Sequence, residues 1–228
     1  MKNLVVLTGA GISAESGIKT FRDAAGLWEG HDVMEVATPQ GFAKNPSLVL
    51  DFYNQRRKQL LSVKPNKAHF GLVSLEKQFN VQIITQNVDD LHERAGSKNV
   101  LHLHGELLKS RSTLDKELIY NCKTDINIGD TCEKNSQLRP HIVWFGEQVP
   151  MLEKAVKIMT IADILVIIGT SMQVYPAASL INYIVHNTRI YFIDPKPLIA
   201  ENDYNKLTII KDTATEGIKK LIKILNNY

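Results

Sequence analysis

Cysteine is scarce in this chain. Its 228 residues include two, Cys122 and Cys132, which excludes a disulfide framework and favours a reducing compartment, the cytoplasm. Long apolar runs are also lacking, whereas a membrane-spanning helix needs about 20 apolar residues in succession. The amino-terminal residues carry a single lysine and only a short apolar run, a pattern unlike that of a signal peptide. We therefore expect a cytoplasmic protein with no membrane partner.

An excess of charge of one sign is lacking as well. The chain has 27 basic and 24 acidic residues, and its net charge of +3 is too small to indicate nucleic-acid binding. Its content of 44% hydrophobic and 22% charged residues is ordinary for a globular protein. This length suits one large domain, or one domain with a small module.

Short apolar segments rich in β-branched residues alternate with helical patterns along the chain. Strands are predicted at 4–7, 81–85, 100–103, 164–168 and 190–193, and helices at 46–61, 67–77, 152–161, 177–186 and 216–225. The nearly continuous apolar character of the strands indicates that both faces of a parallel sheet are buried. The pattern predicts an α/β fold with a Rossmann-like, doubly wound parallel sheet.

Two stretches interrupt this alternation. Residues 25–68 predict an inserted helical module, because they separate the first two strands widely and carry a helical pattern. Residues 106–141 are polar, contain both cysteines and lack helical periodicity, which favours a small β-rich module. The Rossmann-like domain is then predicted to comprise residues 1–24, 69–105 and 142–228.

A glycine-rich segment, Gly9-Ala10-Gly11-Ile12-Ser13-Ala14, follows the first strand. A strand, Gly-x-Gly-x-x-Ala and a helix start form the layout of a dinucleotide-binding turn. A hydride-transferring Rossmann enzyme usually has an acidic residue about 20 residues further on, at the end of a second strand. Residues 28–32 have no strand before them, so the sequence indicates a nucleotide that is bound but used differently.

Polar side chains also follow three later strands, where ligands bind in such sheets. Gln86, Asn87 and Asp89 can hold ribose hydroxyls and a carboxamide, although Asp89 also fits the start of a helix that ends at Gly96. His104 can act as a general base, but single histidines are more often structural. Residues 169–171, Gly-Thr-Ser, suit phosphate or ribose contacts, or an ordinary turn.

Taken together, segments 9–23, 85–96, 102–105, 145–147 and 169–171 resemble the sirtuin family in their order and spacing. The resemblance covers essentially the whole chain. Segments 138–147 and 174–178 are similar to the bacterial, desuccinylase-like (class III) branch of that family.

This resemblance implies an NAD-dependent protein-lysine deacylase that removes acetyl and succinyl or malonyl groups. In the family NAD is consumed: the acyl oxygen attacks the ribose C1′, and nicotinamide and O-acyl-ADP-ribose are released. By similarity His104 is the general base, Asn87 and Asp89 assist it, and Val143, Phe145 and Gly146 line the peptide cleft. The implied NAD contacts are Gly9, Ala10, Gly11, Ser13, Phe21, Arg22, Trp28, Gln86, Asn87, Asp89, Gly169, Thr170, Ser171, Asp194 and Ala214.

Tyr53 and Arg56 lie three residues apart on a predicted helix and therefore share one face. This pair is also consistent with an ordinary amphipathic surface, since Arg57 and Lys58 follow at once. In the desuccinylase-like branch the matching pair lies at the bottom of the acyl pocket. A guanidinium and a phenol suit the far carboxylate of a succinyl or malonyl group.

The chain departs from the family at two places. Most sirtuins hold a structural zinc with two Cys-x-x-Cys pairs, whereas this chain has only two cysteines, and Ser112 falls near the first cysteine position. We expect the β-rich module to hold no zinc. Asp194 stands where the family usually has Asn, and its carboxylate can still accept from ribose hydroxyls.

Three other functions fit parts of this pattern: an NAD-linked oxidoreductase, a mono-ADP-ribosyltransferase, and a non-catalytic module that binds NAD or ADP-ribose. The first would produce NADH, and the second would need no acylated peptide. The presence of His104, Asn87 and Asp89 argues against the third.

Overall fold

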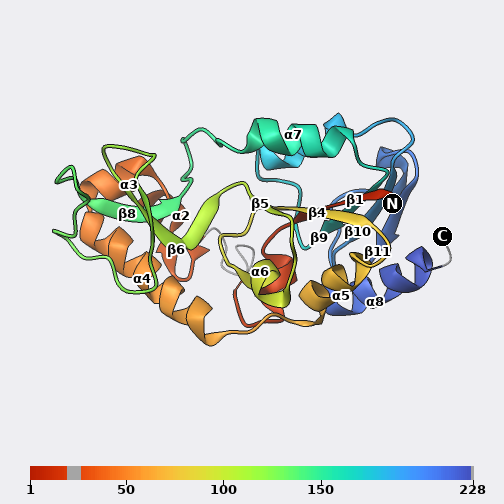
Figure 1. Ribbon diagram of the computed structural model, residues 1–228, viewed down its shortest axis with the longest axis horizontal. Helices are drawn as coiled ribbons and strands as arrows, with labels where there is room; N and C mark the ends of the chain where they lie inside the picture. The colour runs from red at the N-terminus through yellow and green to blue at the C-terminus, as the bar shows by residue number, and fades with distance from the viewer. Residues whose placement is uncertain (20–26, 227–228) are drawn as a thin grey trace.

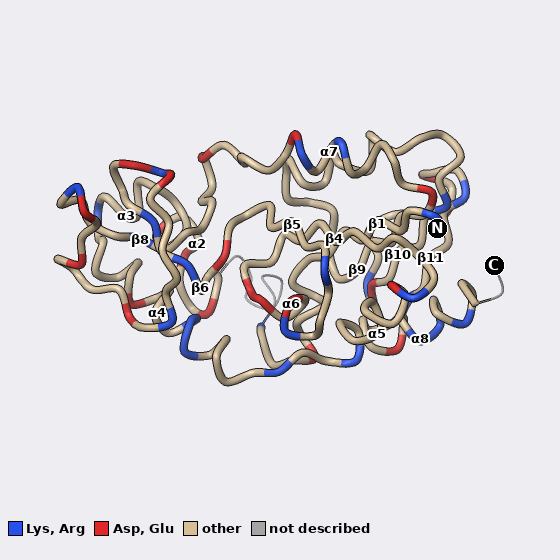
Figure 2. Tube along the Cα trace, viewed as in Figure 1, with Lys and Arg blue, Asp and Glu red and all other residues tan. Residues whose placement is uncertain are grey.

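The computed structural model describes residues 1–19 and 27–226. Figure 1 shows an elongated molecule with a parallel sheet and its helices at one end and a smaller module at the other. Both termini lie at the sheet end (Figure 1). Figure 2 shows acidic and basic residues interspersed over both parts, in keeping with the low net charge.

The main sheet has six strands in the order β11-β10-β9-β1-β4-β5, and every neighbouring pair is parallel. Its strands are β1 (Asn3–Thr8), β4 (Asn80–Thr85), β5 (Val100–His102), β9 (Ile164–Ile168), β10 (Arg189–Ile193) and β11 (Leu207–Ile210). This order confirms the predicted Rossmann-like α/β fold. The edge strand β11 was not predicted, because its short segment Leu-Thr-Ile-Ile is interrupted by a polar residue.

Helices cover both faces of the sheet. Leu4 and Val6 of β1 face one core, where α5 (Lys67–Leu75) and α8 (Ala214–Leu225) pack. Val5 and Leu7 face the opposite core, against α7 (Leu152–Thr160) and the 3-10 helix η1 (Ala177–Tyr183). Figure 1 shows α7 on one side of the sheet and α5 with α8 on the other. Burial on both sides explains why the strands are apolar at successive positions.

The prediction for residues 177–186 needs a correction: the structure has a 3-10 helix there, over Ala177–Tyr183, and no α-helix. This segment lacks a side-chain hydrogen bond at its start, and its last turn ends at Ile184 in an extended conformation. Its backbone is helical as predicted, but wound in the tighter 3-10 form.

The small module contains α2 (Val33–Val36), α3 (Pro39–Lys44), α4 (Pro46–Ser62) and an antiparallel sheet ordered β7-β6-β8. The strands of this sheet are β6 (Gly105–Ser112), β7 (Ile119–Asn121) and β8 (Leu138–Ile142). Arg57 of α4 is fully buried and joins helices to sheet, since its Nε donates to the Leu107 carbonyl at 3.1 Å. The predicted helical and β-rich segments thus pack together, and the limits of the three predicted domain segments stay a prediction.

The remaining elements are short: α1 (Gly11–Ala14), β2 (Leu27–Trp28), β3 (His31–Asp32), α6 (Leu91–Ala95) and η2 (Glu201–Asp203). None of the helices described in the structure combines the length and the apolar character that a membrane crossing requires.

Candidate active site

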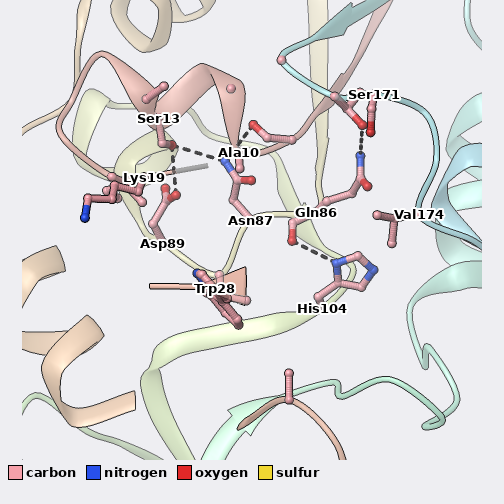
Figure 3. A pocket seen from close by; sticks show the side chains of 18 of the residues that line it. Ala10, Ser13, Lys19, Trp28, Gln86, Asn87, Asp89, His104, Ser171 and Val174 are labelled. Carbon is pink, nitrogen blue, oxygen red and sulfur yellow. Dashed lines mark hydrogen bonds between the residues drawn. The ribbon is translucent and has the colours of Figure 1, made fainter. Parts of the chain in front are cut away.

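One cavity of about 600 Å³ lies where the carboxyl ends of β1, β4, β9 and β10 meet the small module. Its volume is typical of a site for a small molecule or cofactor. Every predicted site residue that the structure describes lines it: Gly9, Ala10, Gly11, Ser13, Trp28, Tyr53, Arg56, Gln86, Asn87, Asp89, His104, Val143, Phe145, Gly146, Gly169, Thr170, Ser171, Asp194 and Ala214. Phe21 and Arg22 lie outside the described residues. Figure 3 shows the polar part of this cavity.

The glycines of the β1–α1 turn are required by contact between two backbone segments. The N–H of Gly11 donates to the Gly169 carbonyl at 2.8 Å, and the N–H of Gly9 donates to Ile168 at 3.1 Å. A Cβ on Gly11 would lie 2.6 Å from the Gly169 Cα, which is too close for any side chain. The turn after β1 is therefore held against the end of β9, and both face the cavity.

Ser13, Asn87 and Asp89 form a hydrogen-bonded group on one wall of the cavity (Figure 3). The Ser13 hydroxyl donates to Asp89 Oδ2 at 3.0 Å, and Asn87 Nδ2 lies 3.3 Å from the Ser13 Oγ. Burial raises the pKa of Asp89, while hydrogen bonds from the Leu91 N–H and Ser13 oppose that shift. The group offers amide, hydroxyl and carboxyl atoms to a ligand with several hydroxyls.

The alternative interpretation, in which Asp89 caps a helix, is also correct in part. Helix α6 begins at Leu91, whose N–H donates to Asp89 Oδ1 at 3.1 Å, although the capping position itself is Asp90. The helix ends at Gly96 in the left-handed conformation, as predicted. Asp89 therefore uses one oxygen for the helix and the other for Ser13.

His104 follows β5 and precedes Gly105, the first residue of β6. Its Nδ1 lies 3.0 Å from the Gln86 carbonyl oxygen, and Figure 3 shows this contact beside the Gln86–Thr170 hydrogen bond. Burial lowers the pKa of His104, with the Gln86 contact opposing it. The neutral ring, the form that accepts a proton, is thus favoured.

His102 was not singled out by the sequence, yet it contacts the same loop. Its Nδ1 lies 3.0 Å from the Asn87 carbonyl and its Nε2 lies 2.8 Å from Glu93 Oε1. Burial opposes the charged ring, but the Glu93 carboxylate outweighs it and raises the pKa of His102. Because both partners can only accept, both ring nitrogens donate, and the protonated ring fits best. Its two-residue spacing from His104 was the only signal in the sequence.

Tyr53 and Arg56 of α4 lie at the end of the cavity that the small module forms. Tyr53 is fully buried, and the Trp144 indole Nε1 donates to its hydroxyl oxygen at 3.0 Å. Burial raises the pKa of Tyr53 far above its ordinary value, so the phenol keeps its proton. The buried Nε of Arg56 has no hydrogen-bond partner among the described residues, and the guanidinium lies 4.9 Å from the Phe52 ring centre.

The segment predicted to bind peptide, Val143 to Gly146, follows β8. The N–H of Val143 donates to the His104 carbonyl at 2.9 Å, and the N–H of Phe145 donates to Ala37 at 3.0 Å. The segment is therefore fixed to both parts of the molecule. Phe145 is 44% exposed, so an extended peptide could reach it.

Asp194 and Ala214 lie at another edge of the cavity, after β10 and at the start of α8. Asp194 is buried, and its Oδ1 accepts from the Lys196 N–H at 2.8 Å. This backbone contact orients the Asp194 carboxylate at the edge of the cavity.

The residues available at the zinc position of the family do not fit a tetrahedral metal site. Cys132 Sγ lies 3.3 Å from the Ser112 Oγ, while Cys122 Sγ contacts the Thr124 carbonyl at 3.4 Å. Across residues 1–19 and 27–226, no group of three or more His, Cys, Asp or Glu side chains is placed to hold a metal ion. A zinc site would need four such ligands.

The fold and the cavity define an α/β protein with a cavity at the carboxyl ends of its parallel strands, the place where such folds bind nucleotides. The model of the Sir2 family matches residues 9–176, so the chain belongs to this family, the sirtuins. The NAD-dependent protein deacylase of Helicobacter pylori (strain ATCC 700392 / 26695) is 60% identical over 222 residues, 97% of this chain and 96% of the relative. That of Bacteroides thetaiotaomicron is 53% identical over 231 residues, 99% of this chain and 98% of the relative.

Solved structures agree with this family. A Sir2 homolog–NAD complex superposes with a TM-score of 0.89 at 40% identity, covering 99% of this chain and 90% of that one. A Sir2 protein bound to acetylated peptide superposes with a TM-score of 0.82 at 29% identity, covering 98% and 93%. The resemblance of the sequence to the sirtuin family is therefore confirmed.

Proposed function

We propose that this protein is an NAD-dependent protein-lysine deacylase, which releases nicotinamide and O-acyl-ADP-ribose. The observation that carries this proposal is the position of a half-buried His104, whose lowered pKa favours the neutral ring, in the same cavity as Ser13, Asn87 and Asp89. Relatives at 53–60% identity are named NAD-dependent protein deacylases, and a Sir2 neighbour is bound to NAD.

The chain's own residues divide the work in this proposal. Asn87 and Asp89 hold the ribose and carboxamide of NAD, and Gly169, Thr170, Ser171 and Asp194 hold its adenosine half. NAD supplies the ribose carbon that receives the acyl oxygen. His104 takes a proton from a ribose hydroxyl through Nε2, because Nδ1 is directed at the Gln86 carbonyl.

The acylated lysine would enter between Val143–Gly146 and the end of β1. An extended peptide would pair with this segment as an added strand. The N–H groups of Val143, Trp144 and Phe145 already donate within the protein, so pairing would use carbonyl groups of the segment and the N–H of Gly146. The two cysteines are free and buried, which is compatible with a reducing cytoplasm.

Acidic acyl groups are the preferred substrates in this proposal. The Tyr53 hydroxyl proton has no acceptor among the described residues, and the buried Nε of Arg56 has no partner there either. A buried donor without a partner costs about 1–3 kcal/mol. The far carboxylate of a succinyl or malonyl group would satisfy both donors, whereas an acetyl group would leave space for water beside Arg56. Acetyl-lysine therefore remains a usable substrate.

Two of the alternative functions are a mono-ADP-ribosyltransferase and a non-catalytic binding module. Neither would require the cavity to continue beyond His104. The cavity extends past His104 to Tyr53 and Arg56, which supports a deacylase. An oxidoreductase usually has an acidic, ribose-binding residue at the end of a second strand of its parallel sheet. The expectation of no strand near residues 28–32 is corrected by the short strands β2 and β3, but these form a separate two-stranded antiparallel sheet. Asp32 therefore does not end a strand of the parallel sheet.

The deciding experiment incubates acetylated and succinylated peptides with NAD and follows the products by mass spectrometry. We expect the acylated peptides to lose their acyl mass and O-acyl-ADP-ribose to form, with no absorbance from NADH. Transfer of ADP-ribose to protein without loss of acyl groups would instead establish the transferase. Unchanged peptides and unchanged NAD would establish the binding module.

A further inference from the structure

The indole of Trp144 determines which way the Tyr53 hydroxyl points. Trp144 follows β8 and is 2% exposed, whereas Tyr53 lies on α4 and is fully buried. The indole Nε1 can only donate, so the Tyr53 oxygen is the acceptor in their 3.0 Å contact. Two segments that are 91 residues apart in the chain are joined by this hydrogen bond.

Accepting this bond restricts the phenol proton. A phenol O–H prefers the plane of its ring and so has two favoured directions. The indole N–H occupies one side of the oxygen, which leaves the other side for the proton. Among the described residues this proton has no acceptor, and Tyr53 lines the same cavity as Arg56.

The indole itself is held firmly. The Trp144 backbone N–H donates to Glu147 Oε2 at 2.8 Å, and the Arg139 guanidinium lies 3.2 Å from the indole ring centre. Glu147 also accepts from Arg139 Nη1 at 2.8 Å, so one carboxylate fixes both the backbone and the cation over the ring. The Phe42 ring packs against the indole, with ring centres 5.3 Å apart.

We propose that Trp144 is a positioning residue for acyl selection, acting through Tyr53. Its indole N–H turns the Tyr53 proton toward the place of the far carboxylate of an acidic acyl group. This inference rests on the proposed deacylase function and extends it to a residue outside the Tyr53–Arg56 pair. Because Val143 and Phe145 flank Trp144, the segment proposed to bind peptide also orients the acyl-selecting phenol.

The test is a double-mutant cycle with Trp144→Phe, Tyr53→Phe and the double variant. Each is assayed for kcat/KM on succinylated and acetylated forms of one peptide. Loss of one hydrogen bond should lower the succinyl-to-acetyl ratio about 2- to 10-fold in Trp144→Phe. In the Tyr53→Phe background the Trp144→Phe change should leave the ratio unaltered, since the hydroxyl it orients is absent.

Phe42→Leu is the matched control, because it loosens packing on the indole but keeps its N–H. It should lower thermal stability and preserve the succinyl-to-acetyl ratio. Equal losses on both substrates in Trp144→Phe, or the same ratio change in the Tyr53→Phe background, would overturn the positioning role. Neither result would affect the deacylase proposal, which falls only if the unaltered protein removes no acyl group.

A second measurement does not depend on the folding of Trp144→Phe. The chain has two tryptophans, so ¹⁵N-labelled tryptophan gives two indole signals, assigned with Trp28→Phe. Tyr53→Phe should move the Trp144 indole proton signal toward the position of an unbonded N–H. An unmoved signal would overturn the inference.

Discussion

Nδ1 of His104 lies 3.0 Å from the backbone carbonyl oxygen of Gln86. Since a carbonyl oxygen only accepts, this contact assigns the ring proton to Nδ1 and leaves the Nε2 lone pair to accept one. The loop after β4 therefore sets the tautomer of the ring that follows β5, and the parallel pairing of these two strands makes the contact possible.

Replacing His104 with Ala should abolish most turnover while leaving NAD binding in place. A positioned general base is worth about 10²–10⁴ in rate. Turnover is measured by nicotinamide release, and binding by calorimetry with NAD. Because burial lowers the pKa of His104, the unaltered enzyme should lose activity on the acid side only below the ordinary histidine value. Near-normal turnover of the variant would refute the assigned role.

Replacing Arg56 with Met should separate the two acyl activities. Met keeps the length of the side chain but removes the charge that a succinyl carboxylate would meet, so desuccinylation should fall strongly. Deacetylation should stay unchanged or improve, since the buried, unpartnered Nε is removed with the charge. Lys58→Met is a matched control on the same helix, because Lys58 pairs with Asp125 in an exposed ion pair. An equal loss of both activities would instead indicate a role in the fold.

The small module should hold no stoichiometric zinc. Ser112 stands close to Cys132, and the described residues include no cluster of three or more suitable ligands. Elemental analysis of protein purified without chelator measures the metal content directly. About one zinc per chain would show that carboxylate or histidine ligands are recruited after all.

Stability should fall as the pH drops from about 6.5 toward 4, because of His69. Burial lowers the pKa of His69 from 6.5 to about 4, and the unfolded chain then binds the proton that the folded one excludes. A pKa lowered from 6.5 to about 4 corresponds to roughly 3–4 kcal/mol of stability, present above pH 6.5 and lost as the pH falls through this range.

Urea unfolding at several pH values measures this slope. His69→Gln should flatten the dependence, because Gln does not titrate. His186→Gln, at an exposed position, should leave it unchanged. The neighbouring His92 is also fully buried, and burial lowers its pKa, so part of the slope should persist in His69→Gln. A slope that is identical in both variants would contradict the assignment to His69.

Local pattern was sufficient for most of the fold. The strands that contain Leu4, Ile83, Val166 and Phe192 are buried on both faces. Burial on both faces requires apolar residues at successive positions, and this pattern can be read directly from the sequence. The edge strand β11 has less to bury, so its sequence carries a weaker signal. The 177–186 segment has apolar spacing typical of a helix, but spacing alone does not distinguish an α-helix from the 3-10 helix that forms there.

The convergence of the candidate site residues on one cavity could be predicted where they fall at the ends of strands. Asn87, Asp89 and His104 all follow apolar strands, and topology then brings them to one cavity. The roles of His102 and Trp144 were not visible in this way. Each acts through a partner from a distant segment, and the direction of a ring N–H depends on tertiary packing that no local spacing contains.

The Glu93–His102 pair has a consequence for how freely this protein can change. The Glu93 side chain is 42% exposed, yet only one imidazole ring separates its carboxylate from the backbone of Asn87. A substitution of Glu93 is therefore expected to affect the site, although this residue lies at the surface of the short helix α6. Removing the Glu93 carboxylate would lower the pKa of His102 and favour the neutral ring. The Asn87 carbonyl would then lose a contact with a charged ring, although no residue that lines the cavity had been changed.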